Sequence, residues 1–385
     1  MLLNRQLRRK LMRGVGVTLV ALTPLCVMSC VNGREGESEE ICTLHFGPIE
    51  SVRSISLSPV TARSRGGIPS GVLSRGDSVY RLPADTLTLY SLSAGGAKAY
   101  FIAEAGDLSL DVENLEIVGE KLNGRKRQFE ITLSDMRRRA AARYDAVAKS
   151  SNLPPDDLRA ELGLLVVREN RNIVRYVMSV VCANRGNALG KYAFWVGVAQ
   201  NRAIDSEEYK KLLVEAGKMV AEFEPIRAVT RRMERSAATS AGCPVADVLL
   251  IDTSGDSTSI TECADGDLTI IHVFDPYDER TPQTMQQLKR IASKYGPGRT
   301  PTTTPMRLVS VAEYAKEDIV NRIASHFGTS WTMLADPEAN FSEVYGIDVL
   351  PFFLIVENGI ILERGVGGEA LPLWVSAYVN ESSDR

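Results

Sequence analysis

The chain has 385 residues, of which 44% are hydrophobic and 24% are charged, and its formal net charge is −3. A chain of this length is longer than one hydrophobic core usually accommodates, so we expect two or three domains. The composition is typical of a soluble globular protein, and the near-balanced charge gives no reason to expect nucleic acid as a partner.

The N-terminus has the pattern of an export signal. A basic stretch over residues 5–13 (RQLRRKLMR) is followed by an apolar run that is short for a membrane-spanning helix. The run ends in Val27-Met28-Ser29-Cys30, which resembles the lipobox of bacterial lipoproteins. The resemblance implies that residues 1–29 are a signal peptide, cleaved before Cys30, and that the Cys30 sulfur carries the lipid that binds the membrane. The alternative is that Cys30 is an incidental residue of an uncleaved N-terminal anchor.

Residues 30–40 are polar and acidic, with no pattern that could form a core, so we expect a flexible tether. Acidic residues close behind the lipidated cysteine also resemble the surface-export signal of some Gram-negative lipoproteins. Together these features predict a lipid-anchored protein in the cell envelope of a Gram-negative bacterium, in the outer membrane, facing either the periplasm or the cell surface.

Short alternations of apolar and polar residues, separated by Gly, Pro, Ser and Asp, occupy residues 41–125. Period-two patterning at this spacing predicts an antiparallel β-sandwich or barrel. Two phrases are more specific: Glu104-Ala105-Gly106-Asp107, and Val118-Gly119-Glu120-Lys121-Leu122-Asn123. They resemble the end of a small β-rich domain of unknown function that precedes thioredoxin-like domains in many lipoproteins of anaerobic Gram-negative bacteria.

Over residues 126–240 the apolar period becomes that of helices, which predicts a helical linker domain. Residues 154–157 (PPDD) favour a helix start, and Asp205 with Glu208 reads as a capping box. The basic run over residues 231–235 (RRMER) is typical of a solvated helix face, and contact with an anionic surface is the alternative.

Residues 241–385 predict the order strand, turn, strand, helix, strand, helix, strand, hairpin, helix, which implies a central mixed sheet covered on both faces. A turn is expected at residues 252–256, another at 357–359, and a loop over residues 296–305. The expected strands are 245–251, 268–274, 306–311, 352–356 and 360–366, and the expected helices are 282–294, 316–326 and a terminal stretch near Trp374.

This order, together with the phrase GIDVLP (residues 346–351), resembles the thioredoxin-like domain of periplasmic and lipoprotein thiol-disulfide oxidoreductases, the reductase group that also serves cytochrome maturation. In that group a C-x-x-C motif opens the helix after a central strand. Aligning Met285 and Leu288 with the apolar residues of that helix places Asp278 at the nucleophilic cysteine and Thr281 at the resolving cysteine. Thiol-disulfide exchange requires a thiolate and a second thiol, so the resemblance implies the fold without the catalytic pair.

A second family marker is present at Leu350-Pro351, where the family has a cis-proline that faces the C-x-x-C loop. An ordinary trans-proline at an edge strand is the alternative. In the active family the groove between these two segments holds an extended substrate segment. The resemblance therefore implies a binding groove in this chain formed by Tyr277, Asp278, Leu350 and Pro351.

Other chemical groups are few. His272 lies in the apolar strand LTIIHVF and is expected to be a core histidine, with a metal site formed with Asp275, Asp278 and Glu279 as the alternative. The sequence has no Gly-rich phosphate loop, no nucleophile elbow and no two-histidine metal spacing, so we expect neither a cofactor nor a metal.

Four cysteines remain after the predicted signal peptide and the lipidated residue: Cys42, Cys182, Cys243 and Cys263. None forms a C-x-x-C motif, so free thiols are expected, although the exported compartment permits disulfides. Cys243 and Cys263 flank the first hairpin of the C-terminal domain and are the candidates for a disulfide or for nonstandard redox chemistry.

Three functions are compatible with these features. The first is a non-enzymatic envelope protein that binds a protein, an extended peptide or another ligand through the former active-site groove or the β-rich domain. The second is a thiol-disulfide oxidoreductase that uses Cys243 and Cys263. The third is a structural member of a lipoprotein complex.

Overall fold

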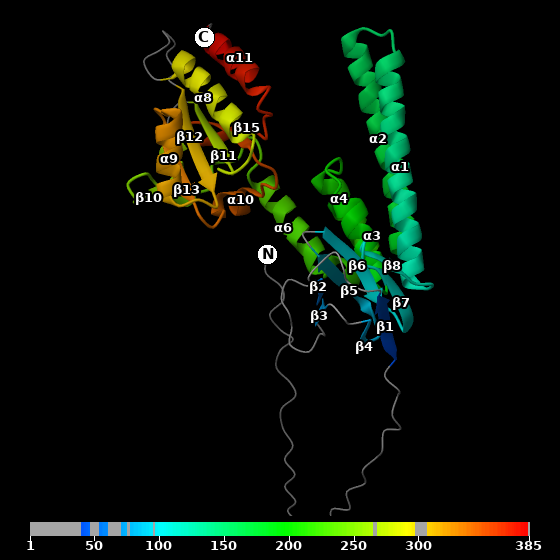
Figure 1. The fold of residues 1–385 in the computed structure, drawn as a ribbon. Helices are drawn as coiled ribbons and strands as arrows, with labels where there is room; N and C mark the ends of the chain where they lie inside the picture. Colours follow the sequence, from blue (N-terminus) through cyan, green and yellow to red (C-terminus); the bar gives the residue numbers. More distant parts are fainter. Residues whose placement is uncertain are drawn as a thin grey trace, which may run out of the picture. The chain divides into compact units, whose positions relative to one another are not determined.

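The computed structural model describes residues 40–46, 54–60, 71–74, 78–94, 97–264, 268–296 and 306–383 (Figure 1). The predicted signal peptide and Cys30 lie outside the described residues, as does the expected loop after Gly296. From Glu40 onward the chain contains β-sheets, then a helical region, then a mixed α/β part, which confirms the coarse multidomain prediction.

The N-terminal domain is a two-sheet sandwich. Its described strands pair in two sheets of order β4-β1-β7-β8 and β3-β2-β5-β6. One apolar cluster takes alternate residues from both sheets, among them Leu44 of β1 and Leu92 of β5, so the period-two pattern marks the buried faces. The strands are β1 Ile41–Phe46, β2 Ser54–Pro59, β3 Gly71–Ser74, β4 Val79–Pro83, β5 Asp85–Ala94, β6 Ala97–Ala103, β7 Gly106–Asp111 and β8 Glu116–Val118.

One pairing differs from the predicted antiparallel arrangement. Strands β1 and β7 run parallel, with Leu44 opposite Leu108, whereas the other described pairs of this domain are antiparallel. Alternation in sequence reports which face of a strand is buried, but it carries no information about the direction of the neighbouring strand. The prediction of a purely antiparallel sandwich was therefore wrong at this pair.

The two phrases that carried the resemblance of this domain meet in space. Glu104 is buried, and its carboxylate accepts hydrogen bonds from the backbone N–H groups of Leu122 and Asn123. The Asn123 side chain in turn bonds to both backbone groups of Ile102, at 3.0 and 2.8 Å. This carboxylate satisfies the first N–H groups of helix α1, which begins at Leu122, four residues before the predicted boundary at 126.

The helical region contains α1 Leu122–Ser150, α2 Pro155–Ala183, α3 Ala188–Phe194, the π-helical segment η1 Trp195–Ala199, α4 Ser206–Ala216, α5 Lys218–Ala221 and α6 Glu224–Ala238. Helices α1 and α2 form a long hairpin (Figure 1). Helix α2 begins at Pro155 as predicted, and Asp205 caps α4 by accepting from the Glu208 N–H at 2.8 Å.

The basic run of α6 is not a purely solvated face. The guanidinium of Arg232 lies 3.2 Å from Asp348, and that of Arg235 lies 2.9 Å from Glu343, both in the C-terminal part of the chain. These two acidic partners were not visible in the sequence because they are more than 100 residues away.

The C-terminal part forms a seven-stranded sheet of order β10-β9-β13-β12-β11-β14-β15. Strands β11, β12 and β13 are parallel to one another, and β14 pairs antiparallel with β11, so the predicted mixed sheet is present. Its elements are β9 Leu249–Ile251, β10 Ser257–Ser259, α7 Ile260–Ala264, β11 Thr269–Phe274, α8 Thr281–Tyr295, β12 Arg307–Glu313, α9 Glu317–Phe327, β13 Thr332–Asp336, α10 Asn340–Tyr345, β14 Phe352–Glu357, β15 Ile360–Arg364 and α11 Leu371–Ser383.

Apolar clusters cover both faces of this sheet. Leu288 of α8 and Val375 of α11 pack on one face with Ile270 of β11, while Phe341 and Tyr345 of α10 pack on the other face. Because β11 is buried on both sides, its run LTIIHVF is continuously apolar rather than alternating. Strand β11 ends at Phe274, directly before the loop that contains the predicted site residues Tyr277 and Asp278.

Candidate functional site

The loop between β11 and α8 is held by its own hydrogen bonds. Asp275 accepts from the Tyr277 N–H through its carboxylate at 2.8 Å, and its carbonyl accepts from the Thr281 hydroxyl at 2.8 Å. Asp278 accepts from the Arg280 N–H at 2.8 Å and, through its carbonyl, from the Thr281 N–H. These hydrogen bonds fix the conformation of the loop between β11 and α8.

Thr281 is buried and is the first residue of α8, with Pro282 in the first turn. Its hydroxyl bonds to Asp275 and does not cap the helix. Pro282 fits this position because the first helical N–H groups have no acceptor within the helix. The structure thus places Thr281 at the start of α8 and Asp278 in the loop before it.

Arg280 joins the two halves of the predicted groove. Its guanidinium donates to the Asp278 carboxylate through Nε at 2.9 Å and through Nη2 at 2.5 Å, and Nη2 also donates to the Leu350 carbonyl at 2.6 Å. The hydrogen bonds from Arg280 lower the pKa of Asp278 to about 2. Asp278 is consequently a fixed anion at physiological pH, paired with an adjacent cation.

Pro351 lies beside this loop. The Leu350–Pro351 peptide is cis, as the resemblance implied, and the following residue Phe352 lies opposite Val273 at the end of β11. Of the four predicted groove residues, Asp278 and Leu350 are brought together through Arg280, and Pro351 follows Leu350. Arg280 itself was not predicted, because nothing in its local sequence indicates a partner 70 residues away.

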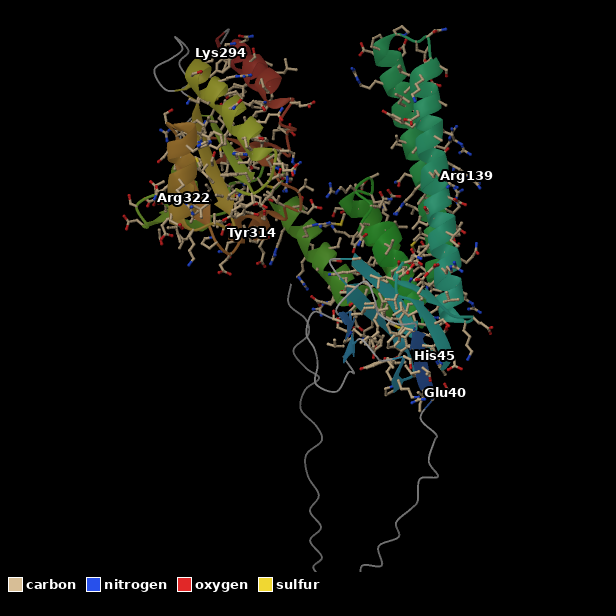
Figure 2. All side chains as sticks on the ribbon, viewed as in Figure 1. Glu40, His45, Arg139, Lys294, Tyr314 and Arg322 are labelled. Atoms are coloured by element: carbon tan, nitrogen blue, oxygen red, sulfur yellow. The ribbon has the colours of Figure 1, made fainter. Side chains whose placement is uncertain are left out.

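Tyr277 belongs to a different neighbourhood. Its side chain is 72% exposed and lines a cavity of about 480 Å³ between the loop and α9. The other lining residues are Pro276, Ile319, Arg322, Ile323, His326 and Phe327 (Figure 2 labels Arg322). This mostly apolar wall with one cation would suit an apolar side chain with an acidic neighbour.

The four described cysteines are all free. Cys42 is buried, and Cys182, Cys243 and Cys263 are partly buried. Cys263 lies in α7, and burial raises the pKa of its thiol, which disfavours the reactive thiolate. The thiols of Cys243 and Cys263 are not bonded to each other in this structure.

The sequence did not indicate Glu313 and Asp336, which are buried at neighbouring positions in β12 and β13. Asp336 accepts from the N–H groups of Asn340 and Phe341, and Glu313 accepts from that of Ser342. Desolvation raises the pKa of Glu313. Both carboxylates therefore serve the start of α10, a role that only the packing of α10 could reveal.

His272 is fully buried, as expected for a core histidine. Its ring stacks between Phe274 and Phe353, with 4.9 Å between ring centroids in each case, and Nδ1 lies 3.3 Å from the Ser310 hydroxyl. Nε2 has no hydrogen-bond partner among the residues that the structure describes. Burial lowers the pKa of His272 to about 3. Among the described residues no group of three or more His, Cys, Asp or Glu side chains could hold a metal ion.

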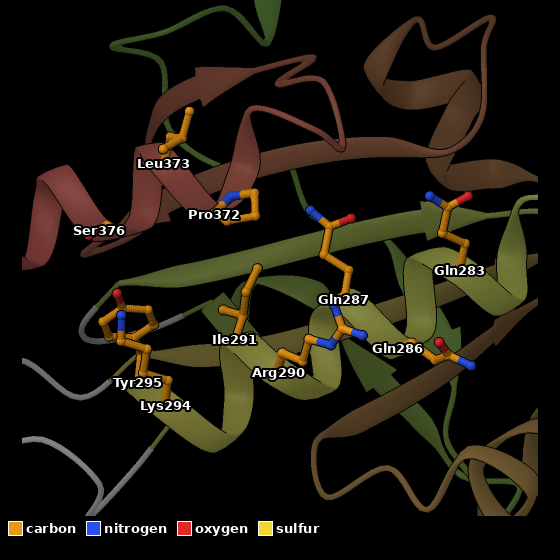
Figure 3. A pocket seen from close by; sticks show the side chains of 10 residues that line it. All are labelled: Gln283, Gln286, Gln287, Arg290, Ile291, Lys294, Tyr295, Pro372, Leu373 and Ser376. Carbon is orange, nitrogen blue, oxygen red and sulfur yellow. The ribbon is translucent and has the colours of Figure 1, made fainter.

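A larger cavity lies away from the predicted site. It measures about 580 Å³ between α8 and α11 and is lined by glutamines, two cations and Leu373 (Figure 3). None of the sequence-predicted residues lines it. Within the described parts of the chain, no helix is both long and apolar enough to cross a membrane.

Comparison with known proteins finds similarity in solved structures. No family model matches the chain, and no curated protein matches it. A thioredoxin-like protein from Bacteroides caccae is 13% identical over 60% of this chain and 88% of its own, with a TM-score of 0.40. A thiol-disulfide oxidoreductase from Bacteroides fragilis is 15% identical over 35% of this chain and 98% of its own (TM-score 0.31). The thioredoxin domain of a thiol-disulfide oxidoreductase from Bacteroides vulgatus is 16% identical over 36% and 98% (TM-score 0.29). Two of these three structures are described as thiol-disulfide oxidoreductases and the third as a thioredoxin-like protein, and each is similar to only part of this chain.

Proposed function

We propose that this protein is an envelope-anchored lipoprotein whose C-terminal thioredoxin-like domain does not exchange disulfides and instead binds a protein segment at the β11–α8 loop. The lipid anchor at Cys30 and the envelope location rest on the lipobox pattern. The binding function rests on the surface around Tyr277.

The absence of redox chemistry follows from the residues at the helix start. Asp278 and Thr281 stand where exchange would need two sulfurs, and neither a carboxylate nor a hydroxyl can form a mixed disulfide. The hydrogen bonds of Asp278 to Arg280 and of Thr281 to Asp275 give both side chains structural roles. The loop is therefore stable in a form that does no thiol chemistry.

The exposed ring of Tyr277 beside an apolar cavity is the observation that carries the binding function. Tyr277 is 72% exposed and lies beside a cavity, and aromatic residues are enriched among the anchors of protein interfaces. Ile319, Ile323 and Phe327 supply a wall against which an apolar side chain of the bound segment would pack. The backbone of the bound segment would extend toward Leu350 and Pro351.

Arg280 sets a condition on this binding. Its bond to the Leu350 carbonyl occupies an acceptor that an extended segment would use in the active family. A segment that reaches Leu350 must displace Arg280 with a donor of its own, whereas one that uses only the Tyr277 cavity need not. Asp278 stays charged in either case.

Two experiments test the proposal. Purified protein should fail to reduce insulin, and combining Asp278→Cys with Thr281→Cys should create a weak but measurable reductase. For binding, a photo-crosslinking amino acid at Tyr277 should give discrete adducts in intact cells, while the same probe at Leu373, which is 76% exposed on α11, should not. Reductase activity of the wild type that thiol capping abolishes would overturn the proposed absence of disulfide exchange. The proposed binding surface would be overturned if the probes at Tyr277 and Leu373 gave the same adducts or if neither gave any.

A further inference from the structure

Helix α2 carries an apolar face that the rest of the domain covers only in part. Toward its C-terminal end, Val174 and Met178 are buried in the core of the helical region. Leu164 and Val167 lie on the same side of the helix, since spacings of three, four and seven residues share a face. Yet their side chains are 73% and 55% exposed. The face therefore continues past the elements that bury it.

Charged residues stand at both ends of this exposed face. Asp157 lies seven residues before Leu164 and Arg171 lies seven residues after it, which is close to two helical turns in each direction. Both side chains are exposed, and neither forms an ion pair within the described residues, whereas the adjacent Asp156 pairs with Arg159. By the same spacing Glu161 and Arg168 also lie on this face, so its N-terminal part is acidic, its centre at Leu164 is apolar and its C-terminal part is basic.

Such a face is complementary to itself when it is turned end to end. An isologous pair about a two-fold axis at Leu164 places each Asp157 opposite the partner's Arg171. The Leu164 side chains of the two copies then face each other at the centre. A parallel pair would instead place like charges opposite each other. Beside the centre, Ala160 has only a methyl side chain and Gly163 has none, which permits close approach of the two helices.

We propose that two copies of this chain associate antiparallel through the face of α2 formed by Asp157, Ala160, Leu164, Val167 and Arg171. The partner is a second copy because the charges at the two ends are opposite and equidistant from Leu164. An anionic membrane surface would be repelled by Asp157, and an unrelated helix would have no reason to match this symmetry. The contact is independent of the proposed ligand surface at Tyr277.

Position-specific cross-linking in cells that express the full chain tests the geometry. Leu164→Cys should yield a disulfide-linked dimer on a non-reducing gel, because the two side chains meet at the axis. Arg171→Cys is the matched control: in an antiparallel pair its two copies stand about 21 Å apart, too far to bridge. The wild-type chain reports the background from its native cysteines.

Charge reversal tests the complementarity. Asp157→Arg or Arg171→Asp, each combined with Leu164→Cys, should lower the association constant about tenfold, since each reversal makes two pairs repulsive. Combining both reversals should restore the dimer. Because these side chains are exposed, their substitution should leave the fold intact, and circular dichroism checks this. The proposal would be overturned if Leu164→Cys gave no dimer or if Arg171→Cys gave an equal yield of dimer. It would also be overturned if the double charge reversal failed to restore the dimer.

Discussion

The guanidinium of Arg280 donates to the backbone carbonyl of Leu350 at 2.6 Å while it also binds the carboxylate of Asp278. One side chain thus ties the start of α8 to the segment that precedes β14. The link consists of an ion pair to Asp278 and a hydrogen bond to the Leu350 carbonyl. Removal of the Arg280 side chain would therefore break both contacts at once.

Replacing Arg280 with alanine should raise the pKa of Asp278 from about 2 part of the way toward the ordinary value of about 3.9, because the guanidinium hydrogen bonds are lost while the one from the backbone N–H of residue 280 remains. Carboxyl titration by NMR measures this. The Leu350 carbonyl is released as well, so adducts from a photo-crosslinker at Tyr277 should increase if the bound segment reaches that acceptor. Arg290→Ala, an exposed position on α8, is the control and should leave the Asp278 pKa unchanged.

His272 should make the protein less stable in mild acid. Burial lowers its pKa to about 3 in the folded state, while the unfolded chain binds the proton near the ordinary value of about 6.5. Stability is therefore unaffected above that value, and it falls by up to about 1.4 kcal/mol per pH unit as the pH drops toward 3.

The variant His272→Leu should flatten this part of the stability curve, as measured by urea unfolding at a series of pH values. His326→Gln, at an exposed position near the end of α9, serves as the control. A His272→Leu curve as steep as that of the wild type would show that other groups cause the acid sensitivity.

Glu104 should contribute to stability through the first turn of α1. Its buried carboxylate accepts from the N–H groups of Leu122 and Asn123, so Glu104→Ala leaves those donors unsatisfied at a helix N-terminus. We expect a loss of about 1–2 kcal/mol in the free energy of unfolding. Glu120→Ala, an exposed neighbour, should cost far less, and equal losses for the two variants in chemical denaturation would contradict this role.

The proposed lipid anchor can be tested at Cys30. Metabolic labelling with an alkyne fatty acid should mark the wild-type chain and not Cys30→Ser, which should be released from membranes because no second strong membrane signal is apparent. Cys26→Ser, inside the predicted signal peptide, should be labelled like the wild type. Recovery of membrane protein with an intact Met1 would refute the cleavage.

The sequence predicted the features that depend on neighbours along the chain. Alternation identified the strands of the sandwich, the continuous run through His272 identified a strand buried on both faces, and the capping box placed Asp205 at the start of α4. The turn before β15 has Asn358 and Gly359 at positive φ, as its Asn-Gly pair indicates. Local rules suffice there because each interaction spans only a few residues.

Tertiary structure alone decided the relationships across long separations. The parallel pairing of β1 with β7, the link from Arg280 to Leu350 and the cavity between Tyr277 and α9 all depend on how distant segments pack. A periodic pattern reports that a side chain is buried or exposed, and it does not report which segment covers it. Since chain direction, register and the reach of a long side chain are set by the packed sheet as a whole, the sequence could indicate the site's location but not its contacts.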